Sequence, residues 1–232
     1  MNAIRHHIHR VPTYVLRSTL ALAVLALVAV TPPALAGGRP GTPPQSSAFG
    51  KTLAEWSAIW WKVGIETPFV PGSPFYDGGI FPLSGSVMGL AAPIGSGTFE
   101  FTLPVGKALV VAGITFECSS LEPPPSGFPG GFHGDTATEQ AACAKSWADQ
   151  IEAMSFTVDG KPVNGIVRVV SPQFSFIAPD PNVLFVPGGP GTAVADGFYV
   201  LLAPMSRGEH TIRIQGSVLG FDVDNLFHIT VE

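Results

Sequence analysis

Apolar and polar residues alternate at a period of two along much of the chain, which indicates β-strands. The clearest case is the stretch 195–216, ADGFYVLLAPMSRGEHTIRIQG. Residues 198–202 form an apolar run, 204–208 have turn chemistry, and from His210 onward apolar positions such as Ile212 alternate with polar ones. Alternate side chains of a strand point to opposite faces. The pattern predicts a hairpin of two strands, and the rest of the chain must cover its apolar face.

The pattern along the rest of the chain predicts further short strands and shows no internal repeat. The turn Asp159-Gly160 is a strong hairpin signal, and Gly113 inside an apolar strand predicts a bulge. Residues 68–97 are rich in glycine and proline and predict a long irregular loop, with short extended pieces near 80–81 and 86–90. The other predicted strands are 98–103, 108–118, 155–158, 161–163, 166–170, 173–177, 182–186 and 226–231.

Two segments have the 3.6-residue period of helices. Thr52 and Glu55 have capping-box spacing before a predicted helix at about 53–65, where the Thr67-Pro68 step stops it. Thr136 and Glu139 repeat that spacing before a second predicted helix at about 137–154. The predicted fold is mainly β: an antiparallel β-sandwich of immunoglobulin-like or jelly-roll type with two α-helices packed on it.

The first 36 residues resemble a secretory signal peptide. A basic leader with Arg5, Arg10 and Arg17 precedes an apolar run at 20–30, and cleavage is expected near Ala36. The alternative is an uncleaved membrane anchor, although the apolar run is short for a bilayer span. The expected organisation is therefore a signal peptide at 1–36, a flexible mature N-terminus at 37–50 and a single domain at 51–232, secreted or periplasmic, without a further transmembrane segment.

Charge and cysteine content narrow the function classes. The net charge is −5, and without the basic leader it is more negative, so nucleic acid is excluded as a partner. No nucleophile elbow, zinc-binding helix, phosphate-binding loop or calcium loop is present. Cys118 and Cys143 predict a disulfide in an oxidising compartment; two buried thiols or a free nucleophilic thiol are the alternatives.

The most suggestive chemistry is the pair Glu117 and Glu122 beside Cys118. Two carboxylates at a rigid strand end suit either a hard cation such as Ca²⁺ or acid–base work on a glycosidic bond. The alternative is that they solvate the rim of a loop. Asp196 joins them as a candidate or makes a turn, and His210 is either a further candidate or a hydrogen-bonded residue at the rim of the core. No cofactor is otherwise predicted.

Tryptophans 56, 60 and 61 allow two interpretations. If these side chains are exposed, Trp56, Trp60 and Trp61 form an aromatic surface on which sugars stack. Their helical spacing beside aliphatic residues instead favours a place in the core.

Several stretches resemble a family of uncharacterised secreted bacterial proteins: TLAEWSAIWWKV, FECSSLE, VRVVSPQFSF and DGFYVLLAPMSRGEHTIRIQG. That family has a Trp-rich N-terminal helix and a C-terminal block D-G-[FY]-x-[VL]-L-x-P-[LM]-S-x-G-x-H-x-I. The similarity covers most of the mature chain but not residues 68–97. It implies secretion and architecture and no activity, and Glu117, Cys118, Glu122, Asp196 and His210 fall in the matched motifs.

The sequence therefore favours a non-catalytic extracytoplasmic protein that binds a small molecule, a glycan or an envelope protein. The alternative is a carbohydrate-active or metal-dependent enzyme that uses Glu117 and Glu122, with help from Asp196 or His210. Geometry separates the two hypotheses, because an enzyme needs these side chains to converge in one cleft.

Overall fold

The computed structural model describes residues 48–93 and 95–232, all within the unit Gly37–Glu232. The predicted signal peptide and most of the predicted flexible segment 37–50 lie outside the described residues. In the described part, no helix is long and apolar enough to cross a membrane.

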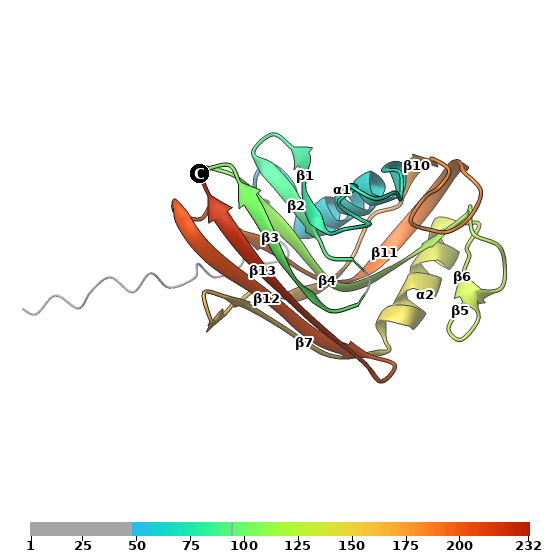
Figure 1. Ribbon diagram of the computed structural model, residues 1–232. Helices are drawn as coiled ribbons and strands as arrows, with labels where there is room; N and C mark the ends of the chain where they lie inside the picture. The colour runs from blue at the N-terminus through green and yellow to red at the C-terminus, as the bar shows by residue number, and fades with distance from the viewer. Residues whose placement is uncertain (1–47, 94) are drawn as a thin grey trace, which may run out of the picture. The chain divides into compact units, whose positions relative to one another are not determined.

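The described residues contain two helices and thirteen strands, joined by turns and loops (Figure 1). The helices are α1 (Leu53–Glu66) and α2 (Ala137–Ala148). The strands are β1 (Gly79–Ser84), β2 (Val87–Ala91), β3 (Gly97–Leu103), β4 (Ala108–Ser119), β5 (Ser126–Gly127), β6 (Gly131–Phe132), β7 (Ile151–Val158), β8 (Lys161–Pro162), β9 (Val167–Val170), β10 (Phe174–Ala178), β11 (Gly189–Leu202), β12 (Gly208–Val218) and β13 (Phe221–Val231).

The strands form two main sheets, so the predicted mainly-β sandwich with two helices is confirmed. The first sheet has the order β1-β2-β4-β11-β10, and β9 also pairs with β11. The second has the order β3-β13-β12-β7-β8, and β5 and β6 make a small separate ribbon. Most pairs are antiparallel, but β2–β4 and β3–β13 are parallel, so each main sheet is mixed.

One core lies between the two sheets and another lies under α1. Val111 and Val200 of the first sheet pack with Ile212 and Phe227 of the second. Because successive side chains of β4 and β11 alternate, their other faces carry apolar residues against α1. Both strands are therefore buried on both faces, which explains their nearly continuous apolar sequences.

The predicted first helix is confirmed as α1, including its capping box at Thr52 and Glu55. The second helix was predicted too long. It ends at Ala148 with Asp149 as its cap, and the residues from Ile151 belong to β7, which pairs with β12. Apolar residues at 151 and 154 continue the helical stripe but fit a strand as well, and pairing with β12 satisfies their backbone groups.

The predicted hairpin at 195–216 is wrong. The strand β11 belongs to the first sheet and β12 to the second, so the segment 203–207 crosses from one layer to the other. The hairpin partner of β12 is β13. The predicted strand 182–186 is a turn. The extended pieces predicted near 80–81 and 86–90 are confirmed as β1 and β2, and their pairing makes a hairpin of part of the predicted loop.

The Asp159-Gly160 turn and the bulge at Gly113 are confirmed. The register of β4 against β11 shifts where Gly113 and Ile114 lie opposite Phe198. A side chain at Gly113 would begin 2.6 Å from Met154 and 2.8 Å from Phe156 of the second sheet, so glycine allows the close approach. A bulge also reverses which residues of a strand face each side, and this decides where the candidate acids point.

Candidate functional site

The fold brings Glu117 and Glu122 together where β4 ends. Thr115 accepts a hydrogen bond from Trp61 of α1 at 3.1 Å. Glu117, two residues further on, therefore lies on the same face of the first sheet, under α1. Glu122 follows on the loop that leaves β4. The two residues are only 4% and 9% exposed, so both carboxyl groups lie in the interior.

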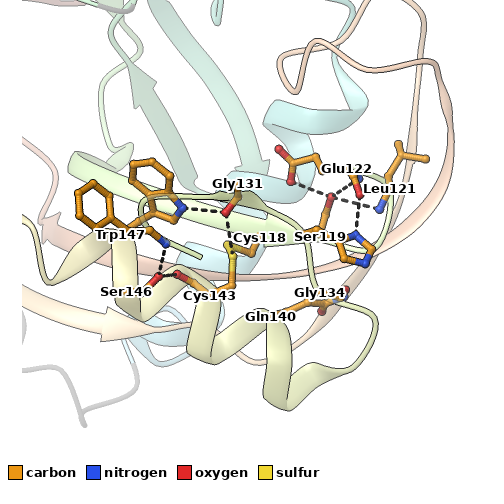
Figure 2. The surroundings of a disulfide bond; sticks show 12 residues. Cys118, Ser119, Leu121, Glu122, Gly131, Gly134, Gln140, Cys143, Ser146 and Trp147 are labelled. Carbon is orange, nitrogen blue, oxygen red and sulfur yellow. Dashed lines mark hydrogen bonds between the residues drawn. A yellow bond between two sulfur atoms is a disulfide. The ribbon is translucent and has the colours of Figure 1, made fainter. Parts of the chain in front are cut away.

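Ser119 and His133 hold the loop around Glu122. The Ser119 hydroxyl donates to Oε2 of Glu122 at 3.0 Å and accepts from the backbone N–H groups of Leu121 and Glu122, each at 3.3 Å (Figure 2). Nδ1 of His133 lies 2.6 Å from the carbonyl oxygen of Glu122. That oxygen can only accept, so Nδ1 of His133 carries the proton. The carboxyl group of Glu122 is thus fixed by its own loop.

The disulfide between Cys118 and Cys143, predicted from sequence, stands on the opposite face of β4, where it joins this strand to α2 (Figure 2). The two Cα atoms are 6.0 Å apart. Trp147 of α2 donates to the carbonyl oxygen of Gly131 at 2.9 Å and stacks on Phe132. Both ends of the loop that carries Glu122 are therefore anchored to α2.

Burial controls the ionisation of the two glutamates. It raises the pKa of Glu122 to about 7, although hydrogen bonds from Ser119 and Glu117 act against the rise. Burial and the neighbouring Glu122 raise the pKa of Glu117 well above its ordinary value. The two carboxyl groups are close enough that each affects the ionisation of the other. Glu117 is the more deeply buried of the two, so it gives up its proton less readily than an exposed glutamate does.

Catalysis or metal binding by this pair would need access and further ligands. Oε2 of Glu117 is buried and has no hydrogen-bond partner among the described residues. In that part of the chain no three His, Cys, Asp or Glu side chains gather as a metal site. A pocket of about 260 Å³ is lined by residues between Gly72 and Ile80 with Phe101 and Thr102, and neither glutamate lines it. Binding of Ca²⁺ by the pair stays a prediction.

Asp196 does not join the glutamates. It is the register partner of Phe116, whose side chain points to the opposite face from that of Glu117. Arg168 of β9 holds the Asp196 carboxylate through Nε and Nη2, both at 2.7 Å, and reaches Asp149 through Nη1, also at 2.7 Å. This network ties the end of α2 to the first sheet.

His210 lies in the second sheet, at the rim of the core, and is hydrogen-bonded as one of the two sequence interpretations expected. Nδ1 lies 2.8 Å from Oδ2 of Asp159, and Nε2 lies 2.9 Å from the carbonyl oxygen of Ser206 and 3.3 Å from its hydroxyl. The other oxygen of Asp159 accepts from the N–H of Thr211 at 2.8 Å. Sequence reasoning missed Ser206 and Asp159, although both stand beside turn signals.

Ser206, His210 and Asp159 have the connectivity of a Ser-His-Asp triad. However, both ring nitrogens face oxygens that only accept, so both carry protons. Although burial acts against the charged ring, hydrogen bonds to Asp159 and to the Ser206 backbone raise the pKa of His210. A protonated ring cannot take a proton from a serine, so this arrangement clamps the β7–β8 turn to the segment that enters β12.

The tryptophans of α1 belong to the core and do not form a sugar platform. Trp56 and Trp60 are buried. Their indole N–H groups donate to the carbonyl oxygens of Ala48 at 3.0 Å and Leu90 at 3.2 Å. Trp61 is half-buried and bonds Thr115 of β4. The interpretation of these residues as core is the one that the structure supports.

A different aromatic surface is exposed. We use this name for the exposed Tyr76 and Phe185 together with the half-buried Phe69. The ring centroid of Phe69 lies 5.1 Å from that of Tyr76 and 5.1 Å from that of Phe185. Phe185 is 69% exposed and has a φ of 56°, a left-handed conformation that costs a bulky residue energy. No periodic pattern in the sequence marks this surface, because its residues come from two irregular segments.

A buried asparagine enforces the conformation of Phe185. The amide nitrogen of Asn182 donates to the carbonyl oxygens of Pro179 and Val186, both at 2.7 Å, and its oxygen accepts from the N–H of Leu184 at 3.0 Å. The loop that joins β10 to β11 is therefore held from within, and Phe185 is presented to solvent in one conformation.

Comparisons with known proteins give no family. No protein-family model and no curated protein matches the chain. Among solved structures, one described as PbICP-C in complex with falcipain-2 is 10% identical over 64% of this chain and 100% of its own, with a TM-score of 0.23. The solution structure of Amebosin is 12% identical over 61% and 100%, with a TM-score of 0.20. Neither likeness is close enough to bear on function.

Proposed function

We propose that the protein is a non-catalytic extracytoplasmic binding protein that recognises a neutral glycan through the aromatic surface. The observation that carries the proposal is Phe185, which an internal hydrogen-bond network holds exposed in a strained backbone conformation. Strain of this kind persists where the surrounding structure enforces it, and it gathers at functional sites. The basic, apolar leader and the disulfide support export.

The chemistry around the aromatic surface favours a neutral polyhydroxylated ligand. Aromatic rings offer apolar faces to the C–H groups of a pyranose, as they do for other apolar groups. Asp77 and Asp180 are exposed next to Tyr76 and Pro181, and the N–H of Phe69 bonds the carbonyl oxygen of Pro181 at 3.1 Å. Carboxylates there can accept from sugar hydroxyls, whereas they repel an anionic ligand.

The test compares two exposed phenylalanines. A glycan array on residues 37–232 selects a ligand, and calorimetry then measures its affinity for Phe185→Ala and for the control Phe221→Ala. Phe221 is 73% exposed and contacts no other ring among the described residues. Loss of one aromatic contact should weaken binding about tenfold in the first variant only. Failure to bind any glycan, or equal loss in both variants, contradicts the proposal.

A carbohydrate-active or metal-dependent enzyme that uses Glu117 and Glu122 is the second candidate. The neighbouring pair of glutamates with raised pKa values favours it, because perturbed carboxyl groups gather at active sites. The burial of both groups counts against it. Hydrolysis of any glycan that is abolished by Glu122→Gln but not by Phe185→Ala would reverse the order of the two candidates.

A further inference from the structure

At the edge of the first sheet that β10 forms, two side chains of α1 bond the outward backbone groups. β10 is the last strand in its row, and α1 packs beside it (Figure 1). Nζ of Lys62 donates to the carbonyl oxygen of Ser175 at 2.6 Å, and Oε1 of Glu66 accepts from the N–H of Ile177 at 3.1 Å. Lys62 and Glu66 are themselves an ion pair at 2.7 Å. Side chains of α1 thus take the place that a neighbouring strand would fill.

Ser175 and Ile177 both direct their backbone groups away from β11. In an antiparallel pair, opposed residues exchange both of their hydrogen bonds or neither. The register partner of Ile177 is Pro190, which has no N–H to give. Ile177 is also 70% exposed. An apolar edge strand with outward backbone groups is a template for another strand.

We propose that a second copy of this chain docks here, with β10 antiparallel to β10 about a twofold axis at Phe176. In that register Ser175 of each copy lies opposite Ile177 of the other copy. Each residue then exchanges both of its backbone hydrogen bonds with its opposite. A twofold contact must be self-complementary, and this pair of residues meets that condition.

Charge complementarity favours a second copy over an unrelated peptide. Lys62 stands beside Ser175 and Glu66 beside Ile177, so the twofold axis brings Lys62 of one copy to Glu66 of the other. The ion pair within each chain is exchanged for two ion pairs between chains. Lys62 and Glu66 release the backbone groups of β10 when the strand of the second copy forms hydrogen bonds with them.

Disulfide trapping tests the register. Variants Ser175→Cys and Ile177→Cys are prepared on residues 37–232, with the native disulfide intact, and are oxidised alone and as a mixture. Hydrogen-bonded opposite residues have Cα atoms about 5.5 Å apart, within reach of a disulfide, whereas positions two residues off lie about 7–8 Å apart. A covalent dimer should form in the mixture only. No dimer in the mixture, or as much dimer from either variant alone, overturns the proposal.

Charge reversal tests the exchanged ion pair. Sedimentation equilibrium of the unmodified chain should show a monomer–dimer equilibrium. Lys62→Glu places like charges across the axis and should weaken association about tenfold or more, and Lys62→Glu with Glu66→Lys should restore it. A chain that stays monomeric at all concentrations, or a double variant that associates no better than Lys62→Glu, overturns the proposal. Circular dichroism verifies that each variant is folded.

Discussion

Replacing Glu122 by glutamine keeps the shape of the side chain and its acceptor for Ser119 but removes the charge. It should therefore make the stability of the protein less dependent on pH. The pKa of Glu122 rises from an ordinary value of 4.5 to about 7 on folding. A raised pKa means that the folded chain holds its proton more tightly than the unfolded chain does. The resulting stability is fully present below pH 4.5 and is lost as pH rises through 7.

The size of the effect follows from that interval. Each pH unit between the two pKa values is equivalent to 1.36 kcal/mol, so by pH 8 the charge of Glu122 costs the folded state about 3 kcal/mol. Glu117 shifts in the same direction and adds to the loss. With little solvent contact at Glu122, screening by water reduces this figure only slightly.

The assay is urea unfolding at a series of pH values from 5 to 8.5 under oxidising conditions. The wild-type chain should lose stability steadily with pH, and Glu122→Gln should lose about 3 kcal/mol less over the range. Glu152→Gln, on an exposed glutamate of β7, is the matched control and should follow the wild type. If Glu122→Gln shows the same slope as the wild type, the pair does not hold its proton and the reasoning is refuted.

Three further outcomes are expected. Replacing Cys118 and Cys143 by serine, which opens a link across 25 residues, should lower the free energy of unfolding by about 3 kcal/mol in urea titrations, and an unchanged midpoint would show that the link adds nothing. Trp60→Ala, in the core under α1, should cost about 3–5 kcal/mol in the same assay, and a loss below about 1 kcal/mol contradicts its packing role. His210→Ala should lower the melting temperature more at pH 5.5 than at pH 8.5, because the raised pKa of His210 makes the charged ring bound to Asp159 the stabilising form. An equal or reversed difference contradicts the role of His210 in holding the β7–β8 turn.

Local signals in the sequence predicted local structure well. Thr52 with Glu55 and Thr136 with Glu139 marked both helix starts, because each capping box is made within four residues. The Asp159-Gly160 turn was predictable for the same reason. The end of α2 was not, because a periodic pattern fits a helix or a strand over a few residues and only pairing with β12 decides between them.

The pairing of strands that are distant along the chain could not be predicted from the sequence. Alternation shows which residues of β11 and β12 share a face, but it does not say which strand lies beside them. The actual hairpin β12–β13 turns at Leu219 and Gly220, both with positive φ, and leucine at such a position gives no turn signal. The sequence therefore indicated most of the strands but not the sheets to which they belong.

The candidate site was predictable only in part. Glu117 and Glu122 were expected together because few residues separate them. The face to which Asp196 points depends on the register of β11 against a bulged β4, and no local pattern carries that information. Phe69 and Phe185 come from irregular segments and meet through tertiary contacts, so no sequence periodicity predicts that their rings lie together.

β4 contributes to several clusters at once: Leu109 to the core between the sheets, Val110 to the core under α1, and Cys118 to the contact with α2. A loss of order in any one of these layers would break hydrogen bonds in the strand that the others share. The described domain should therefore melt in a single cooperative step, and the slowest-exchanging amide protons should follow β4 and β11 through all the layers they join.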